Sequence, residues 1–285
     1  MSEVKQHYER DGLTERIAQA LSNKGFSDDK ILSLSDLAPL DHFHSRGVAA
    51  TQDLAQALDA RPSSKILDIG SGLGGPARYL SEKFACNVTG IDLTQSYVDA
   101  ATYLTERTGL QKRVSFDCGD ALALPYSDAS FDIVVTQHVA MNIEDRERFY
   151  CEAYRVLKPG GQFALYDVTA GEGMQPHFPV PWADSSATSF LKSQAELRDI
   201  LQRQGFAVLK WLDRSADTIT WFEAFTAAQS RYSADGSTMN AGAGGEPRPL
   251  NLSLVVGADF GARVDNLIRS LKENKVTVTE AILRK

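Results

Sequence analysis

The spacing of apolar residues changes about sixty residues into the chain. Residues 13–21 repeat apolar positions at helical intervals, and residues 47–60 do so again, which predicts two amphipathic helices. Beyond a turn that contains proline and serine, short apolar runs take over. We therefore expect an N-terminal helical cap over residues 1–60 and a differently built domain over residues 61–285.

From residue 65 onward, strand-like apolar runs alternate with helix-like segments. The runs are KILDIG, NVTGIDL, RVSFDCGD, FDIVVTQHV and QFALYDVT. Strands and helices that alternate at this spacing form right-handed crossovers, so the strands lie parallel and helices cover both faces of the sheet. Two more strands are expected at 206–214 and 277–283. The pattern predicts an α/β domain.

Two segments interrupt this alternation. Residues 170–190 contain three prolines and two glycines, and a connection of that length is typical of a lid or binding loop. Residues 230–248 are small and polar, which predicts a mobile insertion.

Composition narrows the classes of partner. The net charge is −7, and an acidic surface repels phosphate backbones, so nucleic acid is not expected as a partner. Three widely spaced cysteines form neither a disulfide framework nor a zinc cluster. The polar N-terminus and the lack of a long apolar stretch predict a cytoplasmic protein without a membrane partner. Whether the protein forms a homo-oligomer stays open.

The glycine loop in KILDIGSGLGGPARYL, residues 65–80, is the first candidate for chemistry. Glycines leave room for a ligand beside the backbone, and the helix that follows directs free N–H groups at an anion. The loop fits G-x-G-x-x-G, which is typical of dinucleotide sites. It fits D-x-G-x-G-x-G equally well, with Asp68 in front. The loop alone does not choose between the two cofactors.

Two later aspartates bear on that choice. Asp92 ends the second strand, where a carboxylate accepts hydrogen bonds from a ribose diol. Asp120 ends the third strand, where its carboxylate can receive the amino group of an adenine, while the N–H of Ala121 is offered to the ring.

In this order, ILDIGSGLGG, GIDLT, GDALALPYSDASFDIVV and RVLKPGGQFALYDV resemble the class I methyltransferases that use S-adenosyl-L-methionine. The resemblance implies a Rossmann-like, seven-stranded, mostly parallel sheet with an antiparallel C-terminal strand. It also implies a cofactor site made of Asp68, Gly70, Ser71, Gly72, Asp92, Leu93, Asp120, Ala121 and Gln137. Within it, the glycine loop wraps the methionine part, Gln137 offers its carbonyl to the ammonium group, and Asp68 supports the loop. The product would be S-adenosyl-L-homocysteine.

A narrower resemblance concerns the substrate. LAPLDHFHSRGVAATQDLA, VAMNIEDRERFYCEAYRVLKPGG and PHFPVPWADSSATSFL are similar to the sarcosine and dimethylglycine methyltransferase-like branch. This similarity implies N-methylation of a small amine or amino acid. The alternatives are O- or C-methylation of a phenol, quinone or other natural product, and, from another class, an NAD-dependent oxidoreductase.

Candidate residues on the acceptor side follow from their positions. His138 lies at the end of the fourth strand, where ligands gather, and its ordinary pKa suits a general base. His177 and Trp182 fall in the expected lid, where Trp182 would hold a cationic amine against its face. Arg46 would anchor a substrate carboxylate. The H-x-H of residues 42–44 lacks further ligands, so no metal site is expected.

Overall fold

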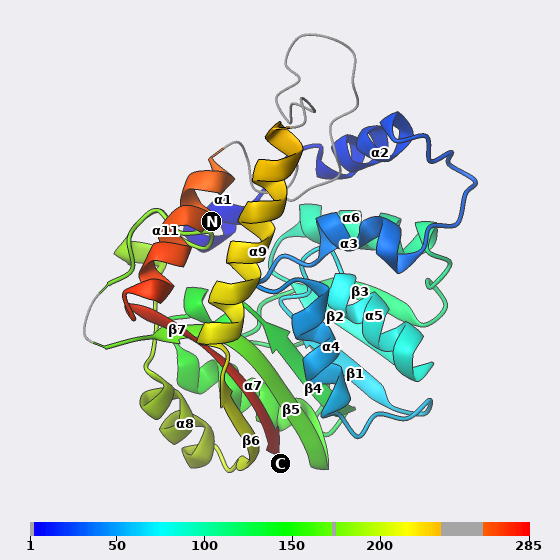
Figure 1. Ribbon diagram of the computed structural model, residues 1–285. Coiled ribbons are helices and arrows are strands. Elements are labelled where there is room, and N and C mark those ends of the chain that lie inside the picture. The colour runs from blue at the N-terminus through cyan, green and yellow to red at the C-terminus, as the bar shows by residue number, and fades with distance from the viewer. Residues whose placement is uncertain (1–2, 173–174, 235–258) are drawn as a thin grey trace.

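The computed structural model describes residues 3–172, 175–234 and 259–285. Its centre is a seven-stranded sheet in the order β3-β2-β1-β4-β5-β7-β6 (Figure 1). The strands are β1 (Lys65–Ile69), β2 (Asn87–Asp92), β3 (Val114–Cys118), β4 (Phe131–Gln137), β5 (Leu157–Ala170), β6 (Ala207–Asp213) and β7 (Val276–Arg284). Strands β1 to β5 pair in parallel, and β7 lies antiparallel between β5 and β6. The predicted seven-stranded, mostly parallel α/β sheet is confirmed.

Helices pack on both faces of this sheet (Figure 1). They are α1 (Glu3–Tyr8), α2 (Leu13–Asn23), α3 (Leu34–Asp41), α4 (Val48–Gln56), α5 (Gly75–Phe84), α6 (Gln95–Arg107), α7 (Arg146–Val156), α8 (Gln194–Arg203), α9 (Ser215–Ala234) and α11 (Phe260–Lys272), with single 3₁₀ turns η1 (Ala140–Asn142) and η2 (Ser186–Thr188). Helix α8 begins at a capping box, in which the Ser193 hydroxyl accepts from the backbone of Glu196.

Alternation along the strands divides the core into two layers. Ile66 of β1 packs in the cluster that contains α4, α5, α9 and α11, whereas the next residue, Leu67, packs with α7 and α8 on the other face. This is the period of two that a strand imposes on its side chains. Asp68 follows two residues after Ile66, so its carboxylate lies on the face that α4 and α5 cover.

The N-terminal residues form more helices than their spacing predicts. The expected pair corresponds to α2 and α4, and α1 and α3 are additional. Helix α3 contains Pro39, which conceals it in the sequence, but a capping box between Ser33 and Asp36 starts it. Leu54 of α4 is buried in the same cluster as the sheet, so on this side the cap shares the main core.

The expected lid is docked and not free. Its described residues include a cis Phe178–Pro179 peptide bond, and α11 holds the segment through side chains. Arg263 donates to the Val180 carbonyl at 3.1 Å, and Asn266 donates to the Pro179 carbonyl at 2.9 Å. Of the insertion expected at 230–248, residues 230–234 complete α9, and the remainder lies outside the described residues.

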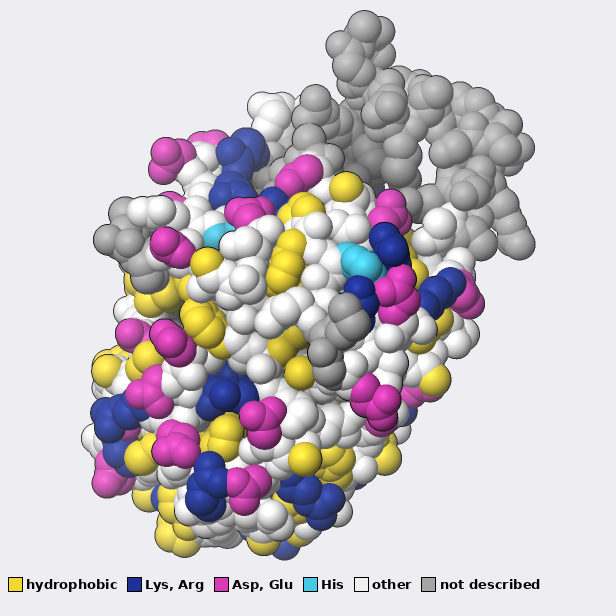
Figure 2. All heavy atoms as spheres, turned by 90° about the vertical axis from the view of Figure 1, so that its left-hand side faces the viewer, with side chains coloured by type: hydrophobic (Ala, Val, Ile, Leu, Met, Phe, Trp, Pro, Cys, Tyr) yellow, Lys and Arg dark blue, Asp and Glu magenta, His cyan; other side chains and the backbone are white. Residues whose placement is uncertain are grey.

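The exterior shows no single dominant charge on the face in Figure 2, where acidic and basic side chains are interspersed. Within the described ranges, no helix has the length and apolar character needed to cross a bilayer.

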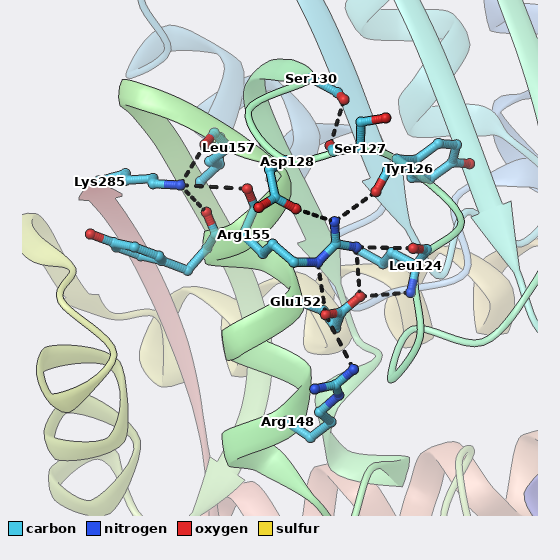
Figure 3. Close-up of polar contacts among 11 residues, drawn as sticks. Leu124, Tyr126, Ser127, Asp128, Ser130, Arg148, Glu152, Arg155, Leu157 and Lys285 are labelled. Carbon is cyan, nitrogen blue, oxygen red and sulfur yellow. Dashed lines mark hydrogen bonds and ion pairs between the residues drawn. The ribbon is translucent and has the colours of Figure 1, made fainter.

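One ion-pair network fixes the loop between β3 and β4 (Figure 3). From α7, Arg155 donates to the carbonyls of Tyr126 at 2.7 Å and Leu124 at 3.0 Å, and it pairs with Glu152. The buried Glu152 carboxylate also accepts from the Leu124 N–H at 2.8 Å. The side chains of α7 therefore satisfy backbone groups of a loop that has no regular structure of its own.

Arg155→Met should lower the free energy of unfolding by about 2–3 kcal/mol, because it leaves loop carbonyls without donors and Glu152 with one fewer cation. Denaturant unfolding measures this loss. As a matched control, Arg203→Met on α8 removes an exposed arginine that pairs with Glu147, and should change stability by less than about 0.5 kcal/mol. Equal effects of the two variants would contradict the anchoring role.

Candidate active site

A cavity of about 1260 Å³ opens where β1, β2 and β4 end. The adjoining loops contribute Gly70–Leu73, Ile91–Thr94, Gly119–Leu122 and Gln137–Val139 to its wall. Parallel strands bring their carboxyl ends to one edge, which is why these loops, distant in the sequence, converge there. Every residue expected to bind the cofactor lines this cavity.

The backbone angles of the glycine loop single out the three glycines of the D-x-G-x-G-x-G pattern. Gly70, Gly72 and Gly74 have positive φ angles of 72°, 51° and 79°. A Cβ at Gly70 would lie 2.2 Å from the Val139 side chain, so only glycine fits there. Gly75 belongs to α5, where a Cβ would lie 2.1 Å from the Asp41 carbonyl oxygen. Glycine at this position therefore lets α5 pack closely against the end of α3 in the cap.

Asp68 and Asp92 place a buried carboxylate and a half-buried one at one end of the cavity. Burial, reinforced by the charge of Asp92, raises the pKa of Asp68 to about 7, and its Oδ2 has no hydrogen-bond partner. Asp92 accepts from the N–H of Gly72 at 2.9 Å and of Thr94 at 3.0 Å, yet burial still raises its pKa. An unbalanced carboxylate in this position favours a ligand that carries positive charge.

The other cofactor candidates lie along the same wall. The Asp120 carboxylate accepts from the Leu122 N–H at 2.8 Å and is exposed beside Ala121. Gln137 is 7% exposed, and its Oε1 accepts from the Thr51 hydroxyl at 3.2 Å. Gln137 Nε2 and Ser71 Oγ are buried without partners. Together with Asp68, these atoms fit a ligand that offers both hydrogen-bond donors and acceptors.

His138 directly follows β4 and lines the same cavity. Its φ is 54°, and its N–H donates to the Tyr166 carbonyl at 2.8 Å. The ring stacks on Tyr166 at a centroid distance of 5.4 Å, and Nε2 lies 3.2 Å from the Ser45 hydroxyl. Burial lowers the pKa of His138 to about 3, so the imidazole is neutral near pH 7.

Two expected acceptor-side residues point elsewhere. Arg46 pairs with Asp53 at 2.6 Å and does not line the cavity. His177 bonds to Glu273 at 2.7 Å and to Lys275 at 3.0 Å, also away from the cavity. His177 was expected at the site because it falls in the expected lid, and Arg46 because it could anchor a carboxylate, but the direction of a side chain depends on tertiary contacts.

Trp182 does line the cavity, although only 1% of its surface is exposed. Its indole N–H donates to Ser189 at 3.0 Å, and its carbonyl accepts from Asn142. It therefore forms a fixed part of the wall. Among the described residues, no group of three or more metal-ligating side chains is found.

Several lining residues carried no sequence signal. The N-terminal helix brings Tyr8, whose hydroxyl donates to Asn142 at 2.8 Å. The acceptor end is lined by aromatic residues of α9 and α11, including Trp221, Phe225 and Phe260. In the sequence these aromatics resemble ordinary core positions, and only the folded chain turns them toward the cavity.

The fold and site together define an α/β protein that holds a cofactor at the carboxyl edge of its sheet. Residues 67–165 match the family model described as a methyltransferase domain. The chain is 31% identical to the sterol 24-C-methyltransferase of Kluyveromyces lactis, over 61% of this chain and 49% of that protein. It is 30% identical to the glycine/sarcosine/dimethylglycine N-methyltransferase of Actinopolyspora halophila, over 62% of this chain and 31% of that protein.

A solved structure, the Haemonchus contortus phosphoethanolamine N-methyltransferase 2 in complex with S-adenosyl-L-methionine, superposes with a TM-score of 0.70 at 19% identity. The alignment covers 94% of this chain and 59% of that one. The chain spans about half the length of the curated relatives it matches. Residues 67–165 are thus a methyltransferase domain, and the sheet has the fold of an S-adenosylmethionine-dependent methyltransferase. The dinucleotide alternative is thereby set aside.

Asp92→Ala should weaken binding of S-adenosylhomocysteine by about 1–3 kcal/mol, because hydrogen bonds from buried ligand hydroxyls would be lost. Calorimetry measures the affinity. Asp99→Ala removes an exposed carboxylate of α6 and serves as the control. Since Asp92 also accepts from two loop N–H groups, the free energy of unfolding of each variant is compared first. Unchanged affinity in Asp92→Ala would reject its role.

Acid should destabilise the protein through His138. The pKa of this imidazole is lower in the folded state than the ordinary 6.5, so its contribution to stability is present above pH 6.5 and is lost as the pH falls toward about 3. From pH 7.5 to pH 5 we expect wild type to lose about 2 kcal/mol more than His138→Asn in urea unfolding. Equal losses would show that the folded protein does not disfavour the imidazolium.

Proposed function

We propose that this protein transfers a methyl group from S-adenosylmethionine to a hydroxyl of a large, mostly apolar small molecule that carries no carboxylate or phosphate. The observation that carries the proposal is the composition of the cavity wall. Among its described lining residues there is no lysine or arginine, whereas acidic side chains occur at several points. An anionic acceptor would be repelled and would find no counter-ion.

The size of the cavity supports an acceptor larger than an amino acid. Its volume of about 1260 Å³ exceeds the roughly 300–1,000 Å³ of a single drug-sized pocket. Beyond the cofactor end the wall is mostly apolar and includes Phe43, Met141 and Trp182 together with the aromatic residues of α9 and α11. A surface of this kind gains most from burying an apolar molecule.

An amino-acid acceptor of the sarcosine type has less support. Its carboxylate needs a cation, and the residue expected to supply one, Arg46, is bonded to Asp53 outside the cavity. We therefore do not carry the acceptor of the narrower resemblance over to this protein.

The residues present account for methyl transfer to a hydroxyl. The cofactor supplies a methyl carbon activated by a sulfonium. The walls orient the acceptor, and orientation is the main requirement for a reaction with such a good leaving group. A hydroxyl oxygen becomes strongly acidic as it forms the new bond, so even an imidazole whose pKa is about 3 can accept its proton. His138 is the group we assign to this step.

A hydrophobic amine is the second candidate acceptor. The aromatic wall and the acidic lining residues Glu144 and Asp265 favour a cationic or polarised amine. An amine that binds in its neutral form attacks without a base, so the two candidates differ in their dependence on His138.

A panel of acceptors tests the proposed class. Hydrophobic alcohols, phenols and secondary amines are compared with glycine, sarcosine and dimethylglycine. The release of S-adenosylhomocysteine is measured for each. We expect turnover with hydrophobic acceptors and at least about tenfold lower kcat/KM with the amino acids. Preference for sarcosine or dimethylglycine would overturn the acceptor class while retaining the methyltransferase.

His138→Asn should lower kcat for a hydroxyl acceptor by about 10²- to 10³-fold and leave the cofactor affinity unchanged. The wild-type rate should be independent of this group between pH 6 and pH 8, since its pKa is about 3. His177→Asn, outside the cavity, is the matched control and should keep its activity. If His138→Asn keeps full activity, the base is absent, and an amine acceptor becomes the better interpretation.

A further inference from the structure

A buried hydrogen-bond cluster connects the N-terminal cap to the cofactor end of the cavity. Thr51 of α4 is 1% exposed, and its hydroxyl lies 3.3 Å from His44 Nε2 and 3.2 Å from the Gln137 amide oxygen. His44 Nδ1 lies 3.2 Å from the Ser45 carbonyl oxygen. The outer atom of the Gln137 amide has no partner in the protein, although Gln137 lines the cavity.

The number of hydrogens in this cluster decides how it is connected. A carbonyl oxygen only accepts, so the contact with Ser45 requires the hydrogen of His44 to be on Nδ1. Burial holds the pKa of His44 well below its ordinary value, so the neutral ring has no second hydrogen. Nε2 therefore presents a lone pair to Thr51, and this lone pair is satisfied only if the single hydroxyl hydrogen of Thr51 is directed to His44 and not to Gln137.

Gln137 must then donate to Thr51. A turn of its amide plane by 180° exchanges Oε1 and Nε2 and supplies that donor. Two other arrangements each leave one bond unmade: Thr51 donates to the Gln137 oxygen and His44 Nε2 has no donor, or the His44 hydrogen is on Nε2 and the Nδ1 lone pair lies against the Ser45 oxygen. In a buried site an unmade bond of this kind costs about 1–3 kcal/mol. His42 Nδ1 lies 3.4 Å from the Thr51 hydroxyl. It either donates to the second lone pair of Thr51 or competes for the Thr51 hydrogen, and in neither case does it replace the missing bond.

We propose that His44 and Thr51 are positioning residues that turn the Gln137 side chain so that its carbonyl oxygen faces the cofactor, where it accepts from the α-ammonium group. The inference rests on the S-adenosylmethionine site. The unpartnered oxygen of Asp68, at the end of the neighbouring strand β1, adds a second acceptor on the same side. In this proposal the cap determines whether the oxygen or the nitrogen of the Gln137 amide faces the cofactor.

Three ligands distinguish the two orientations of the amide. They are S-adenosylhomocysteine, its analogue without the α-amino group, and its analogue without the carboxylate. Calorimetry compares wild type with Thr51→Val, which keeps the shape of the side chain but removes the hydroxyl, and with Thr51→Ser, which restores it.

Thr51→Val should bind S-adenosylhomocysteine and the decarboxylated analogue about 5- to 20-fold more weakly, and the deaminated analogue within about twofold of wild type. Thr51→Ser should regain most of the affinity. A loss confined to the two ligands that carry a carboxylate would overturn the proposal, because the amide nitrogen would then face that carboxylate. Equal loss for all three ligands would also overturn it, because Thr51 would be acting on the fold as a whole.

A second measurement needs no variant. The ¹⁵N shifts of His44 in the wild-type protein report which ring nitrogen carries hydrogen, and we expect Nδ1. A hydrogen on Nε2 would overturn the proposal even if Thr51→Val does not fold. Failure of wild type to bind S-adenosylhomocysteine would instead refute the cofactor assignment, so the two failures are distinguishable.

Discussion

The site is organised by buried carboxylate charge that the described lining residues of the cavity do not neutralise. Asp68 and Asp92 end neighbouring strands, and burial raises the pKa of both. Charge of this kind is costly without a partner, and a cationic cofactor supplies one. The same acidity bears on the acceptor we propose, because the described lining residues include no lysine or arginine to pair with an anionic acceptor. Cofactor choice and acceptor class are thus two consequences of one electrostatic condition.

The segment that joins α3 to α4 contacts residues at both ends of the cavity. At the cofactor end, the Thr51 hydroxyl contacts both His44 and the Gln137 amide, whose orientation we propose this pair sets. At the acceptor end, the Ser45 hydroxyl contacts both His138 and the buried Tyr166. The close approach of Gly75 to Asp41 seats this segment against α5. The N-terminal cap is therefore part of the chemistry of the site as well as its cover.

Much of the end of the cavity that we assign to the acceptor comes from parts of the chain that follow strand β5. Helices α9 and α11 supply its aromatic wall, and α11 also holds the segment around Pro179 through Arg263 and Asn266. The cofactor end, by contrast, uses short turns directly after strands. This division explains how relatives that share the matched domain carry the names of different acceptors, since the two ends of the cavity come from different segments.

The sequence by itself determined the α/β sheet, the antiparallel last strand and the cofactor wall. The alternation of strands and helices follows from local spacing, whereas the antiparallel last strand and the cofactor residues came from the resemblance of ordered motifs to the methyltransferases. It did not reveal α3, whose internal Pro39 masks a helix that its capping box starts. Only the tertiary structure decided that Arg46 and His177 turn away from the cavity and that the aromatic residues of α9 and α11 turn toward it. Side-chain direction depends on which partner lies nearest after folding: Asp53 attracts Arg46, and Glu273 attracts His177. No local sequence pattern predicts these two ion-pair partners.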